Sequence, residues 1–173
     1  MLLVGCGGAT AGPGPIPGDE GVPYASEPTL AEGVSGMPPI CFAEERCDAL
    51  DSDCDGSIDE GCEGVADGDL TVGLAWSGRA SLELDVSAEG SSADTEPTRG
   101  ACDDDSWARV ERRVVDGLAP GPVRISVTRT DRCAAEGPTT ASVAVALGGQ
   151  LIGTYNVLLA EDTSEVVRFS VSR

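Results

Sequence analysis

Residues 81–87 read Ser-Leu-Glu-Leu-Asp-Val-Ser, a strict alternation of polar and apolar side chains. Successive side chains of a β-strand point to opposite faces, so this period of two predicts a strand with one buried and one exposed face. Large apolar residues at alternate positions also mark residues 70–76, 123–127, 143–147, 155–159 and 167–171, and the valine-rich residues 110–115 are a further predicted strand. The sequence therefore predicts about seven short strands.

Turn signals separate these predicted strands. Ser77-Gly78, Ala119-Pro120-Gly121 and Gly148-Gly149 are residue combinations typical of tight turns. We predict a mostly β fold in which residues 66–173 form an antiparallel, jelly-roll-like β-sandwich. The stretch from Leu118 to Ile125 also resembles the Pro-Gly start of a strand in bacterial jelly-roll domains of the pre-peptidase C-terminal kind.

The first 40 residues have a different composition, with nine glycines and seven prolines. Such a chain loses much conformational entropy when it is ordered and has little apolar surface to bury in return. We therefore expect residues 7–40 to form a flexible linker.

The charge and composition of the chain argue against several classes of function. Its formal net charge is -19, from 30 acidic and 11 basic residues, and it contains no histidine. Phosphate binding requires clustered Lys and Arg, so we expect no nucleic-acid partner. A Ser-His-Asp or Cys-His catalytic arrangement is impossible without histidine, and no GxxxxGK[ST] phosphate loop is present. We expect a protein that is not an enzyme, and its negative charge favours a cation over nucleic acid as a ligand.

The seven cysteines are an odd number, and Cys6 stands apart from the others. It ends the stretch Leu3-Val4-Gly5-Cys6, which resembles the bacterial lipoprotein box, in which the cysteine is lipidated after signal cleavage. Residues 1–6 would then be a truncated lipoprotein signal, because only five residues precede Cys6 and a complete signal needs a longer apolar run. The resemblance implies a lipid-anchored protein of the cell envelope, with the outer membrane as the expected location and the protein facing the periplasm or the exterior.

Residues 41–63 read Cys-Phe-Ala-Glu-Glu-Arg-Cys-Asp-Ala-Leu-Asp-Ser-Asp-Cys-Asp-Gly-Ser-Ile-Asp-Glu-Gly-Cys-Glu, and nine of these 23 residues are acidic. Asp51, Asp53 and Asp55 occupy alternate positions and Gly56 follows, as at positions 1, 3, 5 and 6 of a calcium loop. Ser57 would offer its backbone carbonyl, and the apolar Ile58 would anchor the loop against a neighbouring strand or core. Cys62 replaces the glutamate at position 12, so Asp59, Glu60 or Glu63 would complete the coordination.

The cysteines of this segment form its expected frame. Cys41, Cys47, Cys54 and Cys62 can pair in three ways, which the sequence leaves open. Cys102 and Cys133 are the two that remain, and we pair them. Carboxylate and carbonyl oxygens are hard ligands that suit calcium, with an affinity on the order of 0.1 to 1 mM.

The run from Glu45 to Cys62 resembles the MopE-type metal-binding motif of bacterial surface lipoproteins and a shortened thrombospondin type 3 calcium repeat. It departs from the motif at Ala49, where glycine is usual, and at Ser52, where asparagine is usual. Neither change removes a carboxylate. The copper association of the family name does not transfer to a chain without histidine.

Two functions are consistent with these features. In the first, the protein is a non-catalytic, lipid-anchored envelope protein that binds calcium through residues 41–63 and acts as a surface display or adhesion module. In the second, the sandwich binds a carbohydrate or protein ligand, as an accessory to a secreted hydrolase for example, and the acidic motif is only a spacer.

Overall fold

The computed structural model describes residues 23–38, 40–62, 68–90, 93–95, 109–133 and 137–172. All regular structure in these ranges is β-strand. The strands are β1 (Tyr24–Ala25), β2 (Thr29–Leu30), β3 (Val34–Gly36), β4 (Leu70–Trp76), β5 (Ser81–Ala88), β6 (Ala93–Thr95), β7 (Arg109–Val115), β8 (Gly121–Asp131), β9 (Thr139–Leu147), β10 (Gln150–Leu159) and β11 (Thr163–Ser172).

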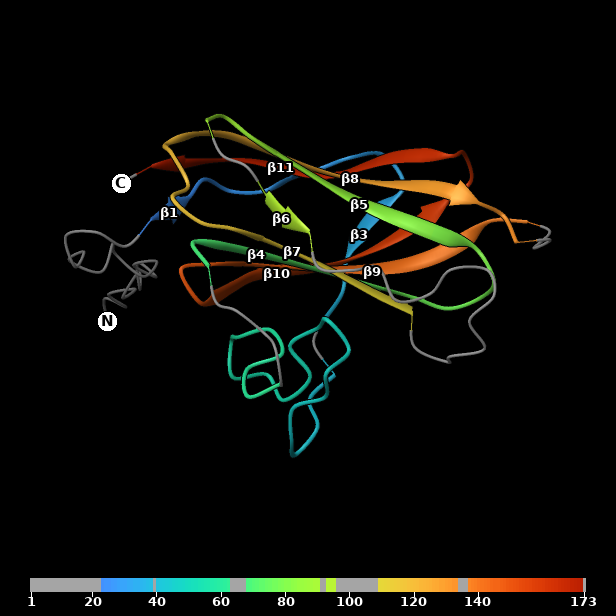
Figure 1. Ribbon diagram of the computed structural model, residues 1–173, viewed down its shortest axis with the longest axis horizontal. Coiled ribbons are helices and arrows are strands. Elements are labelled where there is room, and N and C mark those ends of the chain that lie inside the picture. Colours follow the sequence, from blue (N-terminus) through green and yellow to red (C-terminus); the bar gives the residue numbers. More distant parts are fainter. Residues whose placement is uncertain are drawn as a thin grey trace, which may run out of the picture.

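The strands form two antiparallel sheets that face each other (Figure 1). Sheet A has the order β1-β11-β8-β5, with β2 also paired to β11. Sheet B has the order β3-β10-β9-β4-β7-β6. The predicted antiparallel sandwich is confirmed, and each of the seven predicted segments lies in a strand.

The core lies between the sheets, where the apolar members of each alternating series meet. Leu74 of β4, Leu84 of β5 and Ile125 of β8 are each fully buried there. Trp76 is 5 % exposed, and its indole N–H donates to the carbonyl of Ala80 at 2.7 Å. The turn between β9 and β10 has positive φ at both Gly148 and Gly149, which suits a two-residue hairpin turn.

The free edge of sheet A is closed by two charged side chains of sheet B. β5 is the edge strand, and Leu84 directs its N–H and C=O away from β8. Glu111 accepts the Leu84 N–H at 3.0 Å, and Arg113 Nε donates to the Leu84 carbonyl at 2.9 Å. The two charges also pair with each other at 2.8 Å. A buried ion pair thus takes the place of a neighbouring strand.

Part of the segment expected to be a flexible linker belongs to the fold. β1 and β2 pair with β11 of sheet A, and β3 pairs with β10 of sheet B. The expectation for residues 7–40 is therefore wrong for residues 24–36, while residues 7–22 lie outside the described ranges. The Gly/Pro content of this segment indicates how much entropy the chain loses on ordering. It gives no information on the backbone hydrogen bonds that the edges of β10 and β11 can form with it.

After β3 the chain enters the acidic motif, which lies below sheet B in Figure 1, on the face turned away from sheet A. We use the name acidic motif for residues 40–62. It has no regular secondary structure. The motif is therefore held by its disulfides and by what it contacts on sheet B.

Candidate metal centre

Two interleaved disulfides frame the acidic motif. Cys41 is bonded to Cys54, and Cys47 is bonded to Cys62. Three residues other than glycine have positive φ here: Ala49 at 64°, Cys54 at 64° and Asp59 at 56°. These are tight left-handed turns, which a short chain held by two cross-links can maintain.

Glu45 organises the interior of the motif. Its Oε2 accepts backbone N–H groups from Ser52 at 3.0 Å and from Asp53 at 2.9 Å, and its Oε1 accepts that of Asp59 at 3.2 Å. One carboxylate therefore joins the start of the motif to two later turns. A carboxylate has about four lone-pair sites, so these three bonds leave capacity for another partner.

The three predicted aspartates Asp51, Asp53 and Asp55 fall into two overlapping groups of carboxylates. Ligand oxygens of Glu45, Asp51 and Asp53 lie within 4.8 Å of one another, and so do those of Asp53, Asp55 and Glu60. The two groups share Asp53 and form one continuous cluster of five carboxylates. Backbone N–H groups orient its members: Gly56 donates to Asp51, Asp55 to Asp53, and Ser57 to Asp55.

Two oxygens of this cluster are buried and have no hydrogen-bond partner among the described residues. They are Asp51 Oδ1 and Glu60 Oε2. Asp51 is only 8 % exposed. A buried carboxylate oxygen without a donor costs free energy unless a cation or water compensates it.

The electrostatics of the cluster favour a bound cation. Burial raises the pKa of Asp51; the N–H groups of Gly56 and Cys54 oppose this, and the charges of Asp55 and Asp53 add to it. Burial likewise raises the pKa of Glu60, and the charges of Asp55, Asp53 and Asp51 raise it further. Each shift reports a carboxylate whose negative charge is poorly stabilised in its surroundings.

Asp59 differs from the other predicted ligands because its carboxylate contacts both the motif backbone and sheet B. Both of its oxygens accept the Ala49 N–H, at 2.9 and 3.1 Å, and Oδ2 lies 3.6 Å from Arg112 of β7. Burial raises the pKa of Asp59 to about 6, against the opposing effects of the Ala49 N–H and Arg112. Its ligand oxygens also lie within 4.8 Å of those of Glu45 and Asp48. Asp59 therefore links the motif to sheet B.

The rest of the contact with sheet B is apolar and close. Ile58 is 4 % exposed and packs with Ala144 and Ala146 of β9, as its apolar position predicts. The space beside Gly73 of β4 is filled by the backbone of Ala49, because a Cβ at Gly73 would lie 1.8 Å from the Ala49 carbonyl oxygen. Leu151 N–H of β10 donates to the carbonyl of Gly56.

Of the predicted site residues, Asp51, Asp53, Asp55 and Glu60 thus lie in the two groups that share Asp53, and Asp59 lies in a third group with Glu45 and Asp48. Ser57 lies beside them through its bond to Asp55, and its carbonyl stays a predicted ligand. Sequence reasoning missed the roles of Glu45, Asp48 and Arg112. Glu45 belongs to the motif pattern, but the calcium-loop spacing begins six residues later and gave no reason to count it as a ligand.

The other predicted sites are only partly described. Cys133 is disulfide-bonded. Cys102, Cys6 and Glu63 lie outside the described residues. The two disulfides of the motif indicate an oxidising, extracytoplasmic compartment. Within the described ranges, no helix is long and apolar enough to cross a bilayer.

Comparison with protein-family models, with curated proteins and with solved structures found no match to this chain.

Proposed function

We propose that this is a non-catalytic protein of the cell envelope whose acidic motif binds one calcium ion, and that the ion fixes the motif to the outer face of sheet B. The observation that carries the proposal is Asp51 Oδ1, a buried and unpartnered oxygen of a carboxylate that is grouped within 4.8 Å of ligand atoms of Glu45 and Asp53. A cation at this point would supply the missing partner.

The ligand set favours calcium over other metals. Glu45, Asp51, Asp53, Asp55 and Glu60 offer carboxylate oxygens, and the Ser57 carbonyl and water would complete the coordination. Calcium accepts six to eight oxygens in flexible geometry, whereas zinc and copper prefer the thiolate and imidazole groups that this motif lacks. Asp59 is assigned to Ala49 and Arg112 rather than to the ion.

Calcium binding would act on the whole protein because the motif is joined to three strands of sheet B. Gly56, at the turn of the loop, bonds to β10, Ile58 packs on β9, and Asp59 pairs with β7. A ligand that binds only the folded motif stabilises these contacts by mass action. Lipidation at Cys6 would place this stiffened module at the membrane, where display or adhesion is its proposed role.

The contacts with sheet B also favour this function over the alternative, in which the acidic motif is only a spacer. A mere spacer would not need close contacts with the sandwich. The acidic motif forms a buried ion pair between Asp59 and Arg112, and the Ala49 backbone packs against Gly73.

Calorimetric titration of the full oxidised chain with calcium tests the proposal. We expect saturable binding near one ion per chain, and an increase in stability of about 1 to 3 kcal/mol at about 10 mM calcium. Asp51→Asn keeps the shape of the side chain and should abolish binding. Asp85→Asn, an exposed position on β5, is the matched control for lost charge and should bind normally. Absence of saturable heat, or equal losses in the two variants, would contradict the proposal.

A further inference from the structure

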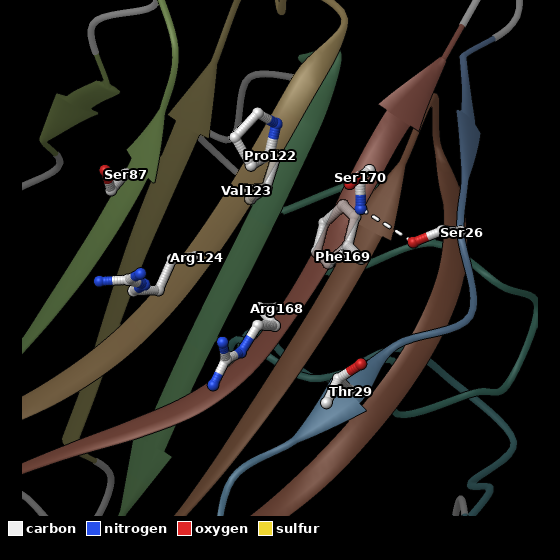
Figure 2. A pocket seen from close by; sticks show the side chains of 9 residues that line it. All are labelled: Ser26, Thr29, Ser87, Pro122, Val123, Arg124, Arg168, Phe169 and Ser170. Carbon is white, nitrogen blue, oxygen red and sulfur yellow. Dashed lines mark hydrogen bonds between the residues drawn. The ribbon is translucent and has the colours of Figure 1, made fainter.

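A groove on a second surface of the molecule is lined by arginine and hydroxyl side chains. The groove has a volume of about 470 Å³ and lies on the outer face of sheet A, turned away from the acidic motif. Figure 2 shows the two arginines of this groove, Arg124 of β8 and Arg168 of β11, with hydroxyl side chains on either side of them. Among the described residues, none of those that line the groove is acidic, although Glu165 lies beside both arginines and the chain has 30 acidic residues and only 11 basic ones.

The polar side chains of the groove stand in one row across four strands. Strand pairing places Arg168 opposite Arg124, Ser87 of β5 opposite Arg124, and Thr29 of β2 opposite Arg168. The row therefore reads hydroxyl, guanidinium, guanidinium, hydroxyl. Neighbouring strands are about 4.8 Å apart, so the row spans about 14 Å.

Two like charges directly opposite each other destabilise a pair of strands. The structure reduces this repulsion with one carboxylate, because Glu165 lies 3.2 Å from Arg124 Nε and 3.0 Å from Arg168 Nε. A β-bulge between Glu165 and Val167 shifts the alternation by one residue and turns Glu165 to the same face as Arg168. Two cations share one anion, so these three side chains keep one net positive charge, and another carboxylate on this face is that of the exposed Asp85 of β5.

The arginines remain accessible to a ligand. The Arg124 and Arg168 side chains are 62 % and 59 % exposed, and Glu165 contacts each of them through Nε. The planar end of a guanidinium can still form paired hydrogen bonds with a carboxylate or sulfate. Beside this row, the Ser26 hydroxyl accepts the Ser170 N–H at 2.9 Å, which orients it at the edge of the groove (Figure 2).

We propose that this groove binds an acidic saccharide, with an anionic group of the sugar held between Arg124 and Arg168 and its hydroxyl groups bonded to Ser87 and Thr29. The net positive charge of Arg124, Arg168 and Glu165 selects an anion. Hydroxyl side chains at both ends of the row suit a ligand that carries hydroxyl groups on either side of that anion. Tyr24 lies on the same face, opposite Ser172, and at 48 % exposure offers a ring on which a sugar could stack.

The proposal is independent of the calcium site, and the test keeps the two apart. Binding of the full chain to oligogalacturonate is measured by calorimetry in calcium-free buffer, so that no calcium ion can bridge the uronate to the acidic motif. The variants are Arg124→Gln and Arg168→Gln. Arg79→Gln, at an exposed position in the turn after β4, is the matched control for lost charge. Asp51→Asn reports on the calcium site.

We expect saturable binding to oligogalacturonate or to a sulfated oligosaccharide, and the comparison of these two identifies which anionic group the site prefers. Arg124→Gln and Arg168→Gln should each weaken binding on the order of tenfold, since each removes a charge-assisted hydrogen bond. Arg79→Gln and Asp51→Asn should bind as the parent protein does.

Four results would overturn the proposal: no binding by the parent protein, an equal loss in Arg79→Gln, equal binding of neutral dextran, or binding of oligoglutamate or inorganic sulfate as tight as that of the acidic saccharides. The last result would indicate an acidic peptide or a simple anion as the ligand. Thermal melting of each variant separates loss of binding from loss of folding.

Discussion

Strands β4 and β5 both face the same core, but their outer faces differ. In β5 the side chains alternate between core and solvent, with Leu82 and Leu84 buried and Glu83 and Asp85 exposed. In β4 the core-facing residues alternate with Thr71, Gly73 and Ala75, of which Thr71 and Gly73 are buried as well. The acidic motif covers that side of sheet B. Alternation of apolar and small residues, rather than apolar and charged residues, thus marks a sheet face that another part of the chain covers.

The largest loss of stability is expected from a substitution at the edge of β5. Glu111→Ala removes the acceptor of the Leu84 N–H and the partner of Arg113. We expect it to lower the free energy of unfolding by about 3 to 5 kcal/mol, because it breaks a buried ion pair. Urea denaturation measures the change.

Glu83→Ala is the control for Glu111→Ala. Glu83 lies 3.9 Å from Arg113, but its side chain is 58 % exposed. A pair so accessible to water should contribute less than about 1 kcal/mol. Equal losses in the two variants would show that the β5 edge does not depend on the buried pair.

The contact between β4 and the acidic motif should also contribute to stability. Gly73→Ala places a Cβ where the Ala49 carbonyl lies, so the acidic motif must move away from sheet B. We expect a loss of about 3 kcal/mol, the upper part of the usual range for overpacking. Gly36→Ala in β3 is the matched control, since nothing lies within 4 Å of a Cβ there.

Calcium affinity gives a second measurement on Gly73→Ala. If the contact with sheet B holds the carboxylate cluster in place, the variant should bind calcium more weakly than Gly36→Ala does. Unchanged stability and unchanged affinity together would mean that the motif does not rest on this face of the sheet.

Only part of the acidic motif could be predicted from the sequence. The spacing of Asp51, Asp53 and Asp55 is local, so the convergence of their carboxylates was predictable. The role of Glu45 depends on how the four nearby cysteines pair, which the sequence left open, and the role of Asp59 depends on Arg112 of β7, which is distant in sequence from the loop. The small residues of β4 were visible beside Leu70, Val72 and Leu74, but only the structure shows what fills the space over Gly73.

In the fold as well, strands with a clear local pattern were predicted, and strands that depend on partners distant in sequence were not. Alternation predicted β5, β8 and β11 because each has one face in the core. The sequence also predicted β7 as a strand from its valines. Nothing local indicates that Glu111 and Arg113 face the interior, because their partner is the backbone of β5 in the other sheet. β1, β2 and β3 were missed because they are short and are held by the edges of strands more than 100 residues later.

A pH dependence should arise at the contact between the motif and sheet B. Burial raises the pKa of Asp59 from 3.8 to about 6, with Arg112 lowering it and Asp48 raising it. The folded protein therefore binds this proton more tightly than the unfolded chain does. The contribution to stability is fully present below about pH 4 and is lost as pH rises to about 6, by on the order of 1 to 2 kcal/mol.

Unfolding of the calcium-free protein from about pH 4 to 7, compared with Asp59→Asn, isolates this contribution. The variant cannot titrate at residue 59, so its stability should decline less over this range than that of the parent protein. Parallel pH profiles would assign the dependence to other carboxylates, of which Glu45, Asp51 and Glu60 also have raised pKa values.

The smallest effect is expected on the exposed face of sheet A. Glu165→Gln removes the anion between Arg124 and Arg168, which stand opposite each other on β8 and β11. The two like charges then repel more strongly, but water surrounds both of them. We expect a loss of about 0.3 to 1 kcal/mol at low ionic strength, measured by urea denaturation.

Salt should change the stability loss of Glu165→Gln, on the exposed face of sheet A, but not that of Gly73→Ala, on the covered face of sheet B. The Debye length falls from about 10 Å at 0.1 M salt to about 3 Å at 1 M, so the effect of Glu165→Gln should largely disappear in concentrated salt. The effect of Gly73→Ala comes from the overlap of two atoms, which salt does not screen, and should persist. If the loss in Glu165→Gln also persisted at 1 M salt, repulsion between the arginines would not be its cause, and Glu165 would have a packing role on a face of the sheet that is otherwise open to solvent.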